Sequence, residues 1–154
     1  MPSATLTKMK PILFHDIDGV LFGAYAGEYQ LRPGVSSWLR WVSEHFDLVW
    51  LTAWEMDRVH GLLRSLYLED IMKSSTYGNW TNYANKETWL RVAVSKLNGR
   101  PWFWIDDIQE DLSGLPAERC IRVNPVEERQ LERLKEDLAE KAGLSMSQQP
   151  GKSM

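Results

Sequence analysis

Residues 12–21 read Ile-Leu-Phe-His-Asp-Ile-Asp-Gly-Val-Leu, and this stretch decides the fold. An apolar run is followed by two carboxylates, Asp16 and Asp18, and then by Gly19. Ionised carboxylates resist burial unless they are paired or bind a metal. In open parallel sheets, ligands bind beyond the carboxyl ends of the strands, which is where we expect these two side chains. The stretch therefore predicts a buried strand that ends at a functional site.

Outward from this strand, strand-like and helix-like runs alternate along the chain. The predicted strands are 11–15, 46–51, a weak one at 71–74, 102–105 and 120–123. Apolar residues at helical spacing predict helices around 35–42, 59–66, 86–97 and 126–142. Alternation with short connections predicts an α/β fold, a Rossmann-like three-layer sandwich in which helices cover both faces of a five-stranded parallel sheet.

Length and composition bound the class of protein. The 154 residues suffice for one full core, and we expect a single domain at 10–143 between a flexible tail at 1–9 and a disordered tail at 144–154. The net charge of −3 argues against a broad cationic field for nucleic acid or acidic membranes. Cys120 is the sole cysteine, so no internal disulfide can form. With no signal-like or membrane-spanning segment, a cytoplasmic protein is expected, and the oligomeric state stays open.

Polar residues also follow the other predicted strands. Thr52 comes after the second strand, and Asp106 and Asp107 come after the fourth. Lys86 begins the helix between them. Because right-handed crossovers bring the carboxyl ends of parallel strands to one edge, we expect these side chains to lie near the acidic pair of the first strand.

The order of acidic pair, hydroxyl, lysine and second acidic pair resembles the motifs of the haloacid dehalogenase superfamily, across about 11–123. The resemblance implies an Mg²⁺-dependent phosphatase that forms an aspartyl-phosphate, with Asp16 as the nucleophile and Asp18 as the general acid and base. Thr52 would bind a phosphoryl oxygen, and Lys86 would neutralise phosphoryl charge and hold Asp16. Asp16, the backbone carbonyl of Asp18 and Asp106 would be the metal ligands.

Several of these roles have alternatives. Asp107 either supports the metal through bound water or pairs with Lys86. Asp111 either gives similar support or is an acid in the first turn of a helix. Lys86 could also be a solvent-facing helix lysine. Strand alternation points His15 away from the site, so we expect it to pack in the core.

The connections leave no room for a large cap domain. A hairpin-like flap at 22–31 and single helices fill the spaces between the motifs. The pieces Asp-Ile-Asp-Gly-Val-Leu, Leu-Val-Trp-Leu-Thr-Ala-Trp-Glu and Trp-Ile-Asp-Asp are also similar to compact, uncapped domains associated with bacterial and phage RNA repair. This narrower resemblance implies a nucleotide or a nucleic-acid end as the phosphorylated substrate.

Loop residues supply candidates for substrate binding. Trp54 and Trp80 could stack on a nucleobase, and Arg32 or Arg58 could contact a further phosphate. The alternative for the tryptophans is core packing, since the chain has eight of them. Three other functions stay open: phosphotransfer on the same scaffold, a phosphatase acting on proteins, and a catalytically silent binding module. Dehalogenation is disfavoured because halide-cleaving relatives lack the second aspartate.

Overall fold

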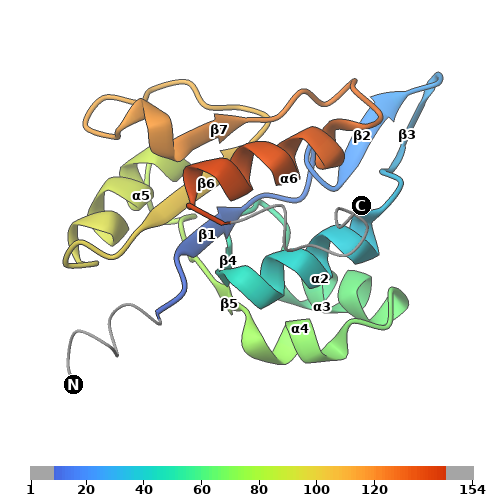
Figure 1. Cartoon of the computed structure of the whole chain (residues 1–154), viewed down its shortest axis with the longest axis horizontal. Helices are drawn as coiled ribbons and strands as arrows, with labels where there is room; N and C mark the ends of the chain where they lie inside the picture. The colour runs from blue at the N-terminus through green and yellow to red at the C-terminus, as the bar shows by residue number, and fades with distance from the viewer. Residues whose placement is uncertain (1–8, 145–154) are drawn as a thin grey trace.

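The computed structural model describes residues 9–144, which form a five-stranded parallel sheet with helices on both faces (Figure 1). The sheet order is β5-β4-β1-β6-β7, so the first strand is central. The predicted α/β fold class is confirmed, and the described residues contain no large cap. The elements in chain order are β1 (Ile12–His15), β2 (Phe22–Tyr25), β3 (Glu28–Leu31), α2 (Val35–His45), β4 (Asp47–Trp50), α3 (Met56–Ser65), α4 (Glu69–Ser74), β5 (Thr76–Tyr77), α5 (Lys86–Ser95), β6 (Trp102–Asp106), a 3₁₀ turn η1 (Ala117–Arg119), β7 (Cys120–Arg122) and α6 (Gln130–Lys141).

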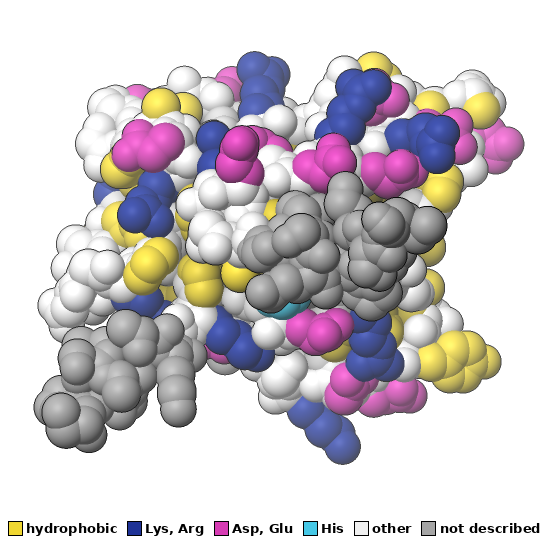
Figure 2. Space-filling model, in the orientation of Figure 1, with side chains coloured by type: hydrophobic (Ala, Val, Ile, Leu, Met, Phe, Trp, Pro, Cys, Tyr) yellow, Lys and Arg dark blue, Asp and Glu magenta, His cyan; other side chains and the backbone are white. Residues whose placement is uncertain are grey.

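Two apolar clusters cover the two faces of the sheet. Leu13 and Phe103 belong to the larger cluster, which includes residues of α2, α3, α4 and α6. Ile12 and Phe14 belong to the smaller one, where Leu90 of α5 packs on the opposite face. Alternate residues of β1 thus serve opposite layers, as the period of two in a strand requires. Acidic and basic side chains are interspersed over the face that carries α6 and α2, in agreement with the small net charge (Figure 2).

Two predicted elements need correction. The segment 71–74 is not a strand but the end of α4, where the Ser75 N–H donates to the Ile71 carbonyl at 2.9 Å. Glu69 and Asp70 in its first turn suit a helix N-terminus, and the strand follows at β5, which pairs with β4. The last helix begins at Gln130 rather than near residue 126, because the chain first turns through 124–129.

The predicted flap is a β-hairpin. Strands β2 and β3 pair antiparallel and project from the end of the sheet (Figure 1). Ala26 and Gly27 join them with φ of 55° and 78°, the backbone that a tight two-residue hairpin turn needs.

The predicted tails at 1–9 and 144–154 lie, apart from Met9 and Leu144, outside the described residues. Within residues 9–144, no helix combines the length and the apolar character needed to cross a membrane.

Candidate active site

Three neighbouring strands end at the same level. His15 at the end of β1 is in register with Trp50 of β4 on one side and with Ile105 of β6 on the other. The Asp16 N–H continues this register by donating to the Ile105 carbonyl at 3.3 Å. Asp16 and Asp106 therefore emerge side by side, as the sequence predicted for the acidic residues at this edge.

Lys86 joins these two carboxylates. Its Nζ lies 3.1 Å from Oδ2 of Asp16 and 2.8 Å from Oδ2 of Asp106, and all three side chains are largely buried. The other oxygen of each carboxylate accepts a backbone N–H, from Ile17 at 2.7 Å for Asp16 and from Ile108 at 3.1 Å for Asp106. Both aspartates are thus fixed in the same way, by one amide and one shared ammonium.

The position of Lys86 is set by the start of α5. The Asn85 side chain caps this helix by accepting the Thr88 N–H at 2.8 Å. The helix therefore begins at Lys86, as predicted, and the lysine points into the site rather than into solvent. This geometry excludes the solvent-facing alternative for Lys86 in this structure.

The electrostatics of the cluster are those of acids in excess. Burial and the nearby Asp16 carboxylate raise the pKa of Asp106. Burial alone would lower the pKa of Lys86, but Asp106 and Asp16 outweigh it and hold the pKa above its ordinary value. Lys86 therefore stays protonated at neutral pH, and its single positive charge is shared by the Asp16 and Asp106 side chains.

A divalent cation fits the remaining charge. Oxygen atoms of Asp16, Asp106 and Asp107 lie within 4.8 Å of one another. Carboxylate oxygens are the ligands that Mg²⁺ prefers, and Mg²⁺ sites commonly use one or two of them. The Asp107 carboxylate packs on Gly19, where an added Cβ would lie 2.2 Å from its Cγ. The absence of a side chain at residue 19, whose φ is +79°, leaves room for that carboxylate.

Asp18 has a different environment from Asp16. Its side chain is exposed and is not part of the three-aspartate cluster. Its two carboxylate oxygens accept hydrogen bonds from the Tyr29 hydroxyl of the flap and from the Trp54 Nε1–H, the latter at 3.0 Å. Its expected contribution to the metal through the backbone carbonyl stays a prediction.

A cavity of about 400 Å³ opens over these groups. Trp80 lines it beside Lys86, and the Trp80 Nε1–H donates to the Thr52 carbonyl at 2.8 Å. Neither Trp54 nor Thr52 lines it. The lining residues are Asp16, Asp18, Ala53, Trp80, Ala84, Asn85, Lys86, Glu87, Asp106, Asp107, Ile108 and Glu110.

Thr52 does not line the cavity. The side chain is fully buried, and its Oγ1 accepts the Trp54 N–H at 3.2 Å. Ala53, the next residue, is the one that reaches the cavity surface. The expected contact between the Thr52 hydroxyl and a phosphoryl oxygen stays a prediction.

Arg32 does not reach the cavity. It is 2% exposed, and its guanidinium donates to the backbone carbonyls of Gly19, Val20, Asn124 and Glu127. These bonds commit the side chain to joining the base of the flap to the segment after β7. In this structure Arg32 is therefore not placed to contact a substrate phosphate.

Asp111 and Glu87 meet at the loop after β6, but their side chains have different environments. Asp111 is exposed, lies 3.2 Å from Arg91, and does not line the cavity. Glu87 is buried and accepts the Glu110 N–H at 2.9 Å and the Asp111 N–H at 3.4 Å. Sequence reasoning missed Glu87 because an acid in the first turn of a helix is common. Its carboxylate orders the loop that follows Asp107.

The His15 side chain is fully buried and points away from the candidate site, as strand alternation predicted. Its Nε2 accepts the Trp38 Nε1–H at 2.9 Å, so Nδ1 carries the proton and donates to the Asp16 carbonyl. Burial lowers the pKa of His15 to about 4, which keeps the imidazole neutral. The hydrogen bond from His15 thus fixes the backbone carbonyl of Asp16.

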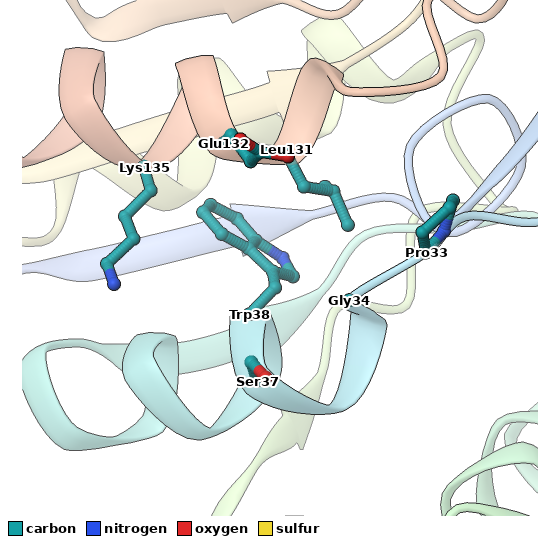
Figure 3. Close-up of a pocket in the computed structure, with 7 residues that line it drawn as sticks. All are labelled: Pro33, Gly34, Ser37, Trp38, Leu131, Glu132 and Lys135. Atoms are coloured by element: carbon teal, nitrogen blue, oxygen red, sulfur yellow. The ribbon is translucent and has the colours of Figure 1, made fainter.

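A second cavity, of about 260 Å³, lies between α2 and α6 and has a different chemical character (Figure 3). Trp38 and Leu131 supply much of its wall, and its charged residues are Glu132 and Lys135. It has neither a group of carboxylates nor a buried cation. The cavity over Asp16 is therefore the better candidate for chemistry.

No family model matches this chain, and no curated protein matches it. Membership of the haloacid dehalogenase superfamily accordingly stays a prediction from the motif order.

Proposed function

We propose that this chain is a compact, uncapped phosphatase of the haloacid dehalogenase superfamily, which hydrolyses phosphate monoesters through an aspartyl-phosphate. The observation that carries this proposal is the position of Asp16. Its carboxylate is held by the Ile17 N–H and by Lys86 Nζ at 3.1 Å, and it faces the same cavity as Asp18. A buried, fixed carboxylate beside a cation is what a nucleophile for a phosphoryl group requires.

The reaction would proceed in two steps. In the first, an Asp16 oxygen forms a bond to phosphorus, the bond to the leaving oxygen breaks, and Asp18 gives its proton to that oxygen. In the second, water attacks phosphorus, its proton passes to Asp18, and the bond between Asp16 and phosphorus breaks. Throughout both steps Lys86 stays charged and offsets the negative charge on the phosphoryl group.

Asp16, Asp106 and Asp107 would hold Mg²⁺, and the resemblance of the motifs adds the Asp18 backbone carbonyl as a further ligand. When bound, the ion would neutralise phosphoryl charge and so reduce the repulsion between the phosphate and Asp16.

The composition of the cavity wall bears on the substrate. Trp80 offers an aromatic surface beside Lys86, which supports a substrate with a planar base. The wall also contains Asp18, Glu87 and Glu110, besides the three aspartates of the metal cluster. Because these acids would repel flanking phosphates, we favour a nucleoside monophosphate over the end of a nucleic-acid strand. Phosphorylated proteins and a silent binding module are the remaining alternatives.

The test is Mg²⁺-dependent phosphate release from an aryl phosphate, nucleoside monophosphates and oligonucleotides with a 3′- or 5′-phosphate. Asp16→Asn is the control, because it removes the nucleophile and keeps the shape. We expect release from the aryl phosphate and the mononucleotides. Faster release from the oligonucleotides would overturn the substrate preference. No release from any ester by the folded chain would favour the binding module or a protein substrate.

A further inference from the structure

Both oxygens of the Asp18 carboxylate are held by neutral donors, one from strand β3 of the flap and one from the loop after β4. The Tyr29 hydroxyl donates to Oδ1, and the Trp54 indole N–H donates to Oδ2 at 3.0 Å. Tyr29 lies in β3 of the flap, whereas Trp54 lies in the segment that follows β4. A carboxylate with a donor on each oxygen has a fixed plane, although Asp18 itself is exposed.

The two donors are held in place by a shared neighbour, because Phe22 packs against both Tyr29 and Trp54. The Phe22 ring stacks on Tyr29 with centroids 5.7 Å apart and an angle of 15° between the planes. Phe22 also contacts Trp54 with centroids 5.6 Å apart, and the Arg58 guanidinium lies 3.7 Å from the Trp54 ring centroid. Tyr29, Phe22, Trp54 and Arg58 therefore form one continuous stack, which we call the flap stack. Within it, neither donor can shift without disturbing an aromatic contact.

The flap that carries Tyr29 is anchored at its base. The Ala24 N–H donates to the Pro125 carbonyl at 2.8 Å, and a Cβ on Gly23 would lie 2.6 Å from that same oxygen. Arg32 ties the base to the carbonyls of Asn124 and Glu127. These contacts hold the hairpin close to the segment after β7 and so fix the side of the site from which Tyr29 approaches.

We propose that Tyr29 and Trp54 are positioning residues that orient Asp18 for proton transfer to the leaving oxygen. This role rests on the proposed phosphatase function. As the bond between phosphorus and the leaving oxygen breaks, the Asp18 proton passes to that oxygen and Asp18 becomes a carboxylate. The Tyr29 and Trp54 donors stabilise the negative charge that develops on Asp18 at that moment. They contribute most when the leaving group needs the proton.

The test compares two esters with different leaving groups. An alkyl phosphate releases a strongly basic alkoxide and needs the proton, whereas a nitrophenyl phosphate releases a stable anion and does not. The quantity to measure is kcat/KM for release of the alcohol, because in a two-step mechanism it reports the first step only. Hydrolysis of the aspartyl-phosphate then does not enter the comparison.

Tyr29→Phe is the main variant, since it keeps the ring on Phe22 and removes one hydroxyl. Tyr29 is 58% exposed, so the change leaves no buried gap. We expect kcat/KM to fall about tenfold for the alkyl ester and less than twofold for the aryl ester. Tyr67→Phe is the matched control, because Tyr67 is 82% exposed and lies outside the flap stack, and it should change neither value.

Two more variants separate positioning from a general loss of structure. Trp54→Phe should lower the alkyl value more than the aryl value in the same way. In an Asp18→Asn background, Tyr29→Phe should leave the ratio of the two values unchanged, because the group that it positions is gone.

The outcomes are distinct. Equal losses on both esters in Tyr29→Phe, or no loss on either, would overturn the positioning role while wild-type turnover leaves the phosphatase proposal standing. No turnover of either ester by the wild-type chain would overturn the proposal that small phosphate monoesters are substrates, and this role with it.

Discussion

Asp16 and Asp18 are two residues apart, yet the chain holds them by opposite means. Asp16 is buried and shares the Lys86 ammonium with Asp106. Asp18 is exposed and is held by the neutral donors Tyr29 and Trp54. The difference matches two tasks: a nucleophile must stay ionised next to other acids, whereas a proton carrier must change its charge in each cycle. A permanent cation suits the first task, and neutral donors suit the second.

The strongest way to break the comparison is to remove the nucleophile. Asp16→Asn should lower phosphate release by about a thousandfold or more, because it removes the carboxylate that would form the aspartyl-phosphate. The fold should be intact by circular dichroism, since the amide is isosteric with the carboxylate. Retention of a tenth of the activity would contradict the assignment of Asp16.

Lys86→Met removes the ammonium group that contacts the Asp16 carboxylate. We expect kcat/KM to fall by about 300-fold, as the phosphoryl charge and Asp16 both lose their cation. Without Mg²⁺ the variant should also lose about 3–5 kcal/mol of stability, because the buried Asp16 carboxylate loses its cation. Added Mg²⁺ should raise its Tm more than that of the wild type.

The measurement for this variant is thermal melting in EDTA and in Mg²⁺, alongside the kinetic assay. Lys135→Met, in the wall of the cavity between α2 and α6, is a control that removes a lysine far from the aspartates. A Tm of Lys86→Met in EDTA equal to that of the wild type would show that the ion pairs do not stabilise the cluster.

Asp18→Asn tests the second half of the comparison, the role of Asp18 as the general acid. The value of kcat/KM should fall about a hundredfold for an alkyl phosphate and far less for an aryl phosphate, because only the former requires the proton. The ratio of the two esters is the informative quantity. Equal losses would mean that Asp18 is not the general acid, and the contrast with Asp16 would lose its functional meaning.

Gly19→Ala should have the smallest effect of these variants. Gly19 follows Asp18 in the chain and packs on the carboxylate of Asp107. A left-handed φ of +79° costs a residue with a Cβ about 1–2 kcal/mol, and the new methyl would displace the Asp107 carboxylate. We expect a lower Tm and a weaker rise of Tm with Mg²⁺. Gly27→Ala, also at positive φ but in open space, is the control for backbone strain alone.

Local patterns in the sequence predicted the sheet well. Apolar runs predicted β1, β4, β6 and β7 within a residue or two, because each lies in the buried sheet. The pattern failed at 71–74, where one buried isoleucine in a single helical turn gives no periodicity to separate helix from strand. The short strand β5 has two residues and is defined by its pairing with β4 rather than by its own composition.

For the site, the sequence predicted the residues that stand at strand ends, since topology alone brings them together. It did not predict which residues hold the Asp18 side chain. Tyr29 reaches Asp18 because of the register of the β2–β3 hairpin, and no charge pattern in the sequence indicates that register. Nor did it predict that Arg32 would be buried under that hairpin. An arginine looks the same in sequence whether it binds a phosphate or caps carbonyls.

Arg32 also has a consequence for the order of folding. Its bonds to Asn124 and Glu127 span 92 and 95 residues of the chain. Contacts of such long range form late, because a large loop must close before they stabilise anything. The base of the flap, and with it the hydroxyl of Tyr29, is therefore secured only after the segment beyond β7 has been synthesised and docked. A nascent chain that ends before residue 124 would carry its nucleophile and lack the anchored flap.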